Sequence, residues 1–199
     1  ALNRSGIKKQ GAHAADVFTD GVLKLFRPVL ILISAWLLSS TLRELDAITV
    51  LSGLLQGNLP PATFPALVFL TGALISFSTG TSWGTMGILM PLALPVALGF
   101  TDGMVNPLIH GTVAAVFSGA VFGDHCSPFS DTTIVSSISC GIEPMEHVKT
   151  QMPYALIAAG VAIFAGFLPA GYGLNPYAAL TLGAVTLALL ATFFRTKTP

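Results

Sequence analysis

Charged residues are scarce in this sequence. Aspartate, glutamate, lysine and arginine make up 9% of its 199 residues, whereas they form about a quarter of an average soluble domain. Hydrophobic residues make up 53%, and the mean hydropathy is +0.78. So few charges cannot cover a water-facing surface, which excludes an ordinary soluble domain. The nine basic and nine acidic residues cancel, so there is no positive field that would attract nucleic acid.

Cysteine is equally rare. Cys126 and Cys140 have no zinc-site spacing and offer no disulfide framework, so we expect both to be small buried residues. The first 21 residues are polar and contain no apolar stretch of the signal-peptide type. Because the sequence starts with alanine, we expect it to be the C-terminal piece of a longer protein.

Long apolar segments dominate the remaining sequence. Several approach the roughly 20 residues that a helix needs to cross a bilayer. The pattern predicts an all-α, polytopic membrane protein, with a polar cytoplasmic lead-in over 1–21 and a transmembrane domain over 22–199. Residues 45–58 are too short to span and are predicted to be an interfacial or re-entrant piece. In the polar segment 141–152, Glu143, Glu146 and His147 are predicted to form a solvated loop face. The expected apolar helices cover 22–42, 62–78, 86–100, 107–123, 153–170 and 176–194.

The basic residues predict an orientation. With the start of the chain in the cytoplasm, eight of the nine lysines and arginines fall on the cytoplasmic side and only Arg43 falls outside. The loops at 101–106 and 171–175 carry none. Membrane proteins carry an excess of lysine and arginine on their cytoplasmic side, so both ends of the chain are predicted to face the cytoplasm.

A first polar break interrupts the apolar pattern at residues 76–85. Six of these ten residues are serine or threonine and two are glycine. Small hydroxyl residues can simply pack helices closely in a membrane. The glycines also let the helix unwind, and unwound carbonyls with hydroxyls coordinate cations such as sodium. The candidate site residues of this break are Thr79, Gly80, Thr81, Ser82 and Thr85.

A second break contains ionisable residues between apolar stretches. A charge at the centre of a bilayer costs at least about 2.5 kcal/mol by insertion scales, so such residues are normally paired or functional. Pro128 prevents one continuous helix, which predicts a helix, a break and a short helix over 133–140. The candidates are Asp124, His125, Ser127, Ser130, Asp131, Thr132 and Thr133.

Each ionisable residue of this break also has an alternative role. Asp131 can cap the second helix by accepting hydrogen bonds from the amides of Thr132 or Thr133. Asp124 can be an interfacial charge at the end of a span. His125 can be paired with a neighbouring carboxylate. Because the cap accounts for Asp131 more simply, Asp124 is the leading candidate for a functional carboxylate.

With these motifs in view, the sequence resembles the NhaC family of sodium/proton antiporters. The matching stretches are TGTSWGT at 79–85, GAVFGDHCSPFSDTT at 119–133 and TQMPYA at 150–155. The pair Ala35-Trp36 in an early span also fits. The likeness covers nearly the whole chain from about residue 20, and the second stretch is long and chemically unusual.

The resemblance implies one half of an inverted-repeat transporter from the larger ion-transporter superfamily. Each half of such a protein contributes a re-entrant hairpin and a broken helix. Here 62–100 would be the hairpin, with its tip at 79–85, and 107–140 the broken helix, and the two breaks would meet near the midplane. The implied setting is the inner membrane. The implied partners are the lipid bilayer and the N-terminal half of the protein, a second chain or a second copy.

The resemblance also implies cation/proton antiport rather than an enzymatic reaction. Asp124 or Asp131 would bind either Na⁺ or a proton, and hydroxyl groups of both breaks would complete the oxygen shell. No cofactor is expected beyond the transported Na⁺ and H⁺. Exchange of malate and lactate, exchange of amino acids, and an inactive half-transporter that needs a partner chain remain alternatives.

Overall fold

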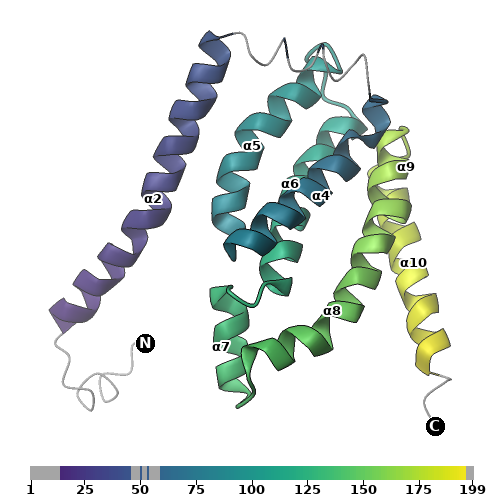
Figure 1. Ribbon diagram of the computed structural model, residues 1–199. Helices are drawn as coiled ribbons and strands as arrows, with labels where there is room; N and C mark the ends of the chain where they lie inside the picture. The colour runs from purple at the N-terminus through teal and green to yellow at the C-terminus, as the bar shows by residue number, and fades with distance from the viewer. Residues whose placement is uncertain (1–13, 46–49, 51–52, 54–58, 196–199) are drawn as a thin grey trace.

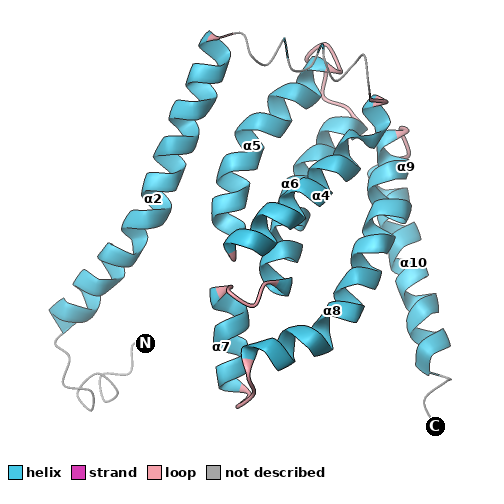
Figure 2. Ribbon diagram, viewed as in Figure 1, coloured by secondary structure: helices cyan, strands magenta, loops and turns pink. Residues whose placement is uncertain are grey.

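The computed structural model describes residues 14–45, 50, 53 and 59–195. Throughout these residues the regular structure is helical and contains no strand (Figure 2), which confirms the all-α prediction. Four helices of the described chain are long and apolar enough to cross a membrane: Pro61–Thr79, Ser82–Gly99, Pro144–Gly171 and Pro176–Phe193. The predicted short segment 45–58 lies almost entirely outside the described residues.

The first helix, α2, spans Ala14–Glu44. It therefore starts inside the predicted lead-in, and the predicted domain boundary at residue 21 falls within it. In Figure 1, the start of α2 and the end of the last helix, α10 (Pro176–Arg195), lie at the same end of the molecule. Lys149 belongs to a helix that begins at this end, whereas Arg43 lies at the other end of α2.

Helices α4 (Phe64–Thr79) and α5 (Ser82–Gly99) form a hairpin. A short 3-10 turn, η1 (Pro61–Thr63), precedes α4. At the tip, Gly80 has a φ of 65° and its amide donates to Ser76 O at 2.8 Å. This left-handed conformation is readily available only to glycine. The predicted unwinding at the second glycine is wrong, because Thr81 already caps α5 and Gly84 is helical.

Helix α6 (Pro107–Cys126) is the most enclosed helix. It lies alongside α4 and runs in the same direction, since the early residues Pro65 and Gly111 are neighbours and the late residues Ala73 and Gly123 are neighbours. A small-residue stripe at four-residue spacing makes this approach possible. The stripe consists of Gly111, Ala115, Gly119 and Gly123.

The close approach of α4 and α6 depends on missing side chains. A methyl group added at Gly119 would collide with the carbonyl oxygen of Phe69, and one added at Gly123 would collide with that of Ala73. Ser76 adds a cross-helix hydrogen bond, because its hydroxyl donates to Ala120 O at 2.5 Å. The glycines of this stripe lie on the buried face of α6, whereas Phe117 and Val121 on its other face are exposed.

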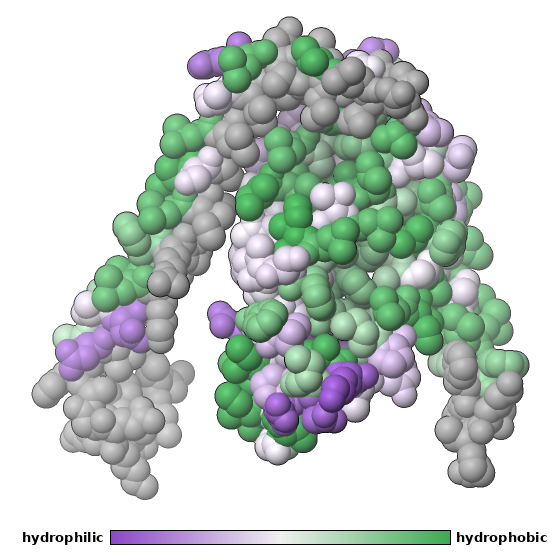
Figure 3. All heavy atoms as spheres, viewed as in Figure 1, coloured by the Kyte–Doolittle hydropathy of each residue, from purple (hydrophilic) through white to green (hydrophobic). Residues whose placement is uncertain are grey.

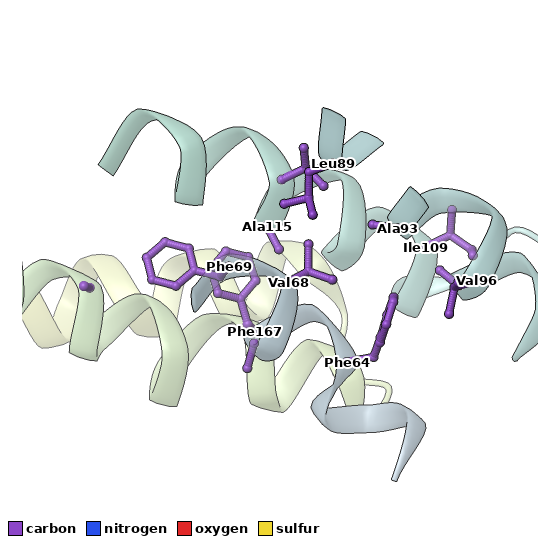
Figure 4. Packing of buried hydrophobic residues seen from close by; sticks show 13 residues of the cluster. Phe64, Val68, Phe69, Leu89, Ala93, Val96, Ile109, Ala115 and Phe167 are labelled. Atoms are coloured by element: carbon purple, nitrogen blue, oxygen red, sulfur yellow. The ribbon is translucent and has the colours of Figure 1, made fainter. Parts of the chain in front are cut away.

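An apolar core fills the space between the hairpin, α6 and the later segment that carries Ala159 and Phe167. The rings of Phe69 and Phe167 have centroids 5.2 Å apart, and the rings of Phe64 and Phe100 are equally close. Figure 4 shows Phe69 and Phe167 side by side. Within the apolar stretch Pro61–Thr79, 44% is buried inside the fold, whereas only 6% is buried within the apolar stretch Pro176–Phe193. The hairpin is thus held by protein contacts, whereas α10 presents most of its surface outward.

A short helix, α7 (Asp131–Ser139), follows α6 after a break, and α8 (Pro144–Val161) follows α7. A π-helical segment, η2 (Ala162–Phe167), and α9 (Leu168–Gly171) continue α8. The predicted loop around Glu146 and His147 is wrong, because α8 already begins at Pro144, although Glu143 and Glu146 are exposed as expected. Proline suits this position, since the first amides of a helix have no partner within it.

Hydrophilic and apolar surfaces are separated along the molecule. Figure 3 shows apolar side chains over the middle of the visible face and hydrophilic ones near the start of α2 and where α7 meets α8. This distribution fits helices whose middles face lipid.

The expectation of two buried cysteines is half right, because Cys126 is buried and Cys140 is exposed.

Candidate functional site

The two polar breaks lie against each other, as the resemblance implied. A Cβ atom at Gly80, in the hairpin tip, would lie 2.9 Å from Phe129 O and 3.1 Å from Ser130 N. These atoms belong to the break between α6 and α7. Only a residue without a side chain permits this approach, so the tip and the break meet through their backbones.

The break itself is a compact turn over residues 127–130. The amide of Ser127 donates to Asp124 O at 3.1 Å, and the amide of Phe129 donates to the hydroxyl of Ser127 at 3.3 Å. Proline at position 128 stops α6 from continuing, as predicted. Ser127 and Ser130 are fully buried, so the turn is an internal part of the fold.

Ser130, rather than Asp131, caps α7. The hydroxyl of Ser130 accepts a hydrogen bond from the amide of Thr132 at 3.2 Å. Asp131 is the first residue of the helix and its side chain is exposed. The predicted cap was therefore placed one residue too late. A carboxylate in the first turn still interacts favourably with the helix dipole.

Asp124 is the buried carboxylate of the site. It lies in the last turn of α6 and is 8% exposed. The hydroxyl of Thr132 donates to its Oδ2 at a long 3.5 Å, and the hydroxyl oxygens of Thr132 and Ser130 are 2.7 Å apart. Asp124 lies near the end of α6, where the alternative of an interfacial charge at the end of a span also places it, and its side chain is buried. The break thus connects the hydroxyl of Ser130 to that of Thr132, and the hydroxyl of Thr132 to the carboxylate of Asp124.

His125 contributes its backbone rather than its ring to this arrangement. Its side chain is exposed, and among the described residues no carboxylate lies within ion-pair distance of it. Its carbonyl accepts hydrogen bonds from the hydroxyl of Thr133 at 3.3 Å and from the side-chain amide of Gln151 at 3.4 Å. Pairing of His125 with a carboxylate is therefore not what the structure shows.

The hydroxyls of the first break bond mainly within the hairpin. The Thr79 side chain is exposed and donates to Ile75 O at 2.9 Å. Thr81 accepts from the amide of Gly84 at 3.3 Å, and the buried Thr85 donates to Thr81 O at 2.8 Å. Ser82 is half-buried. These oxygens keep lone pairs, so their use as donors leaves them able to bind a cation.

Four helix ends converge where the breaks meet. Helices α4 and α6 end there, at Thr79 and Cys126, while α5 and α7 begin there, at Ser82 and Asp131. The ends of helices carry partial negative charge and the starts carry partial positive charge. The junction can therefore hold a cation at the first pair, and the carboxylate of an organic anion at the second pair.

The groups available as ligands at the junction are oxygen atoms, which are typical of a site for a hard cation. Nowhere in the described chain do three histidine, cysteine, aspartate or glutamate side chains form a group that could hold a metal ion. The site offers one buried carboxylate, several hydroxyls and the carbonyls at helix ends. Sequence reasoning missed two residues that bond to the backbone of α6: Ser76 donates to Ala120 O and Gln151 donates to His125 O. Ser76 lies in the first polar break and Gln151 in the TQMPYA stretch, but which helix each would meet was not visible in the sequence.

The sequence matches known proteins over most of its length. Residues 5–171 match the model of the Na+/H+ antiporter family. The chain is 32% identical over 165 residues to a Haemophilus influenzae protein named "Uncharacterized Na(+)/H(+) antiporter", covering 80% of this chain and 32% of that protein. It is 31% identical over 139 residues to the Na(+)/H(+) antiporter NhaC of Alkalihalophilus pseudofirmus, covering 65% and 27%.

A further relative bears another substrate name. The chain is 33% identical over 119 residues to the malate-2H(+)/Na(+)-lactate antiporter of Bacillus subtilis, covering 58% of this chain and 24% of that protein. The chain thus spans about a third or less of the length of these relatives. No solved structure gives a significant match. The family match covers most of the chain, including both breaks, and the chain belongs to the Na+/H+ antiporter family.

Proposed function

We propose that this chain carries the cation site of a secondary active transporter that exchanges Na⁺ for H⁺. The observation that supports this most directly is the burial of Asp124 in the last turn of α6, beside the hydroxyls of Thr132 and Ser130. Among the described residues no lysine, arginine or histidine lies within ion-pair distance of Asp124, and a buried carboxylate in such surroundings needs either a cation or a proton to neutralise it.

Competition at one carboxylate couples the two ions. A cation next to Asp124 favours its charged form, whereas a proton removes the charge that holds the cation. The site therefore carries one ligand at a time, and each crosses the membrane in the opposite direction. The hydroxyls of Ser127, Ser130 and Thr132, with Thr81 and Ser82 of the hairpin tip, are the proposed neutral ligands. Asp131 is a secondary candidate, because its side chain is exposed.

The arrangement of the helices supports a re-entrant hairpin. In Figure 1, α7 and the first turns of α8 continue past the tip of the α4–α5 hairpin, toward the end of the molecule where α2 begins. We propose that this end faces the cytoplasm across the inner membrane, because the sequence puts eight of the nine lysines and arginines into segments predicted to be cytoplasmic. Alternating access would then come from rocking of the hairpin and the broken helix against the other helices.

The exchange activity is proposed for the whole protein. This chain spans about a third or less of its relatives, so we expect the remaining chain, or a second copy, to complete the pathway. Residues 1–199 expressed alone are expected to insert into the membrane without exchanging ions.

The test replaces Asp124 by asparagine in the full-length protein, reconstituted into vesicles. A Na⁺ gradient should drive proton movement in the wild type, and Asp124→Asn should abolish it. The matched control is Asp102→Asn, which removes an exposed carboxylate in the α5–α6 loop, where φ is 50° and asparagine is well tolerated. Unchanged exchange in Asp124→Asn would remove this residue from the mechanism.

Exchange of organic anions is the second candidate function. It is supported by the named malate/lactate relative and by the helix starts of α5 and α7 at the junction, which could hold a substrate carboxylate. The same vesicles distinguish the two. Proton movement driven by Na⁺ alone favours cation exchange, whereas a requirement for malate, lactate or an amino acid on the opposite side favours the second candidate.

A further inference from the structure

The first turns of α8 have an inner and an outer face. Val148 is 7% exposed and packs inward. Lys149 and Glu146 form an ion pair of 2.9 Å on the outer face, where both side chains are more than half exposed. Residues three apart share a helix face, so Gln151 lies on the same side as Val148. This segment is therefore docked on the protein interior.

A bend in α8 brings this docked segment across the end of α6. Figure 1 shows the first turns of α8 running beside α7 before the helix turns to run alongside α10. The helix contains Pro153, which has no amide to donate to the carbonyl of Lys149 and whose ring crowds that carbonyl. Proline within a helix causes such bends.

Gln151 reaches the backbone of the proposed cation site. Its Nε2 donates to His125 O at 3.4 Å, and Thr133 donates to the same carbonyl at 3.3 Å. His125 follows Asp124 directly in the last turn of α6, where carbonyl groups have no amide partner in the helix. One side-chain amide from α8 and one hydroxyl from α7 thus fasten the turn that carries Asp124.

We propose that Gln151 is a positioning residue of the cation site. It contacts neither the carboxylate nor the bound ion, but it holds the end of α6 so that Asp124 faces the hydroxyls of the break. Its loss leaves this turn free to separate from α8, and the cation then binds to a site that is formed only part of the time. This assigns a role to the TQMPYA motif. The effect on ion affinity rests on the proposed function; the effect on the position of α6 does not.

Transport kinetics test the first part. In the full-length protein, Gln151→Ala and the isosteric Gln151→Glu, which has no amide donor, should raise the KM for Na⁺ about three- to ten-fold, the factor expected for one lost hydrogen bond. The maximal rate should change far less, because the chemistry of Asp124 is intact. Lys149→Ala, on the outer face of the same turn, is the matched control and should leave both values unchanged.

Thiol labelling tests the second part without any transport. Cys126, next to His125, is 2% exposed, so its reaction with a membrane-permeant maleimide reports opening of the end of α6. In a protein whose other cysteines are serine, Gln151→Ala should speed labelling about three- to ten-fold, and Lys149→Ala should not. Equal labelling in Gln151→Ala and wild type would overturn the proposal.

The two readouts separate the two hypotheses. If wild-type vesicles show no Na⁺-driven exchange but Gln151→Ala still speeds labelling of Cys126, the proposed function fails and the positioning of α6 stands. If exchange is present and neither KM nor labelling responds to Gln151, the positioning role fails and the proposed function stands. A fall in maximal rate with unchanged KM would also contradict a role in positioning the binding site.

Discussion

Gly80 and Phe129 are in backbone contact, although one lies in the tip of the α4–α5 hairpin and the other in the break between α6 and α7. A Cβ atom at Gly80 would lie 2.9 Å from Phe129 O, and the φ of Gly80 is 65°. Two separate demands, a left-handed backbone and a missing side chain, therefore exclude other residues from this position. The contact links the tip of the hairpin to the turn that follows Asp124.

Replacing Gly80 by alanine should damage both the fold and the junction. The left-handed backbone costs a residue with a side chain about 1 kcal/mol, and the collision with Phe129 should add about 1–3 kcal/mol. Gly103→Ala is the matched control, because Gly103 has a φ of 77° but nothing within 4 Å of its Cβ position. Thermal unfolding in detergent should rank wild type, Gly103→Ala and Gly80→Ala in falling order. Equal losses in the two variants would mean that the contact contributes nothing.

The glycine stripe of α6 should be intolerant of single methyl groups. At Gly119 and Gly123 the added methyl would meet the backbone carbonyls of Phe69 and Ala73. Backbone cannot move aside as a flexible side chain can, so alanine at either position should cost about 1–3 kcal/mol of stability.

The comparison for this stripe is Gly160→Ala in α8, where nothing lies within 4 Å of the added methyl. Alanine favours helix over glycine, so Gly160→Ala should be neutral or slightly stabilising. The measurement is again thermal unfolding in detergent. Tolerance of alanine at both Gly119 and Gly123 would argue against the close packing of α4 on α6.

Loss of the Ser130 cap should loosen α7 in particular. The hydroxyl of Ser130 bonds the amide of Thr132 at 3.2 Å, and removing a cap of this kind costs about 1 kcal/mol. Ser130→Ala should therefore speed hydrogen exchange of the α7 amides about five-fold. Ser139→Ala, which removes an exposed hydroxyl bonded only to Val135 O, should have little effect. Faster exchange in Asp131→Asn than in Ser130→Ala would instead favour Asp131 as the cap.

The helices and breaks were largely predictable from local signals. Pro128 predicted the end of α6, and the glycine and hydroxyl residues around Gly80 predicted a break in the hairpin. The error at residues 144–152 arose because the local pattern does not show contacts with distant helices. Residues 144–152 read as a polar loop because their outer face carries Glu146 and Lys149, while the inward contacts of Val148 and Gln151 depend on helices that are distant in the sequence.

The sequence by itself determined the membrane class, the helical content and the places where the helices break. Hydropathy, proline and glycine act within a few residues, so they can be read without knowing the neighbours. Only the tertiary structure decided which aspartate is buried, that Ser130 caps α7, that Gly80 meets Phe129 and that Gln151 bonds to His125. Burial and hydrogen bonding between helices depend on which helices become neighbours, and the spacing of residues along one chain does not contain that information.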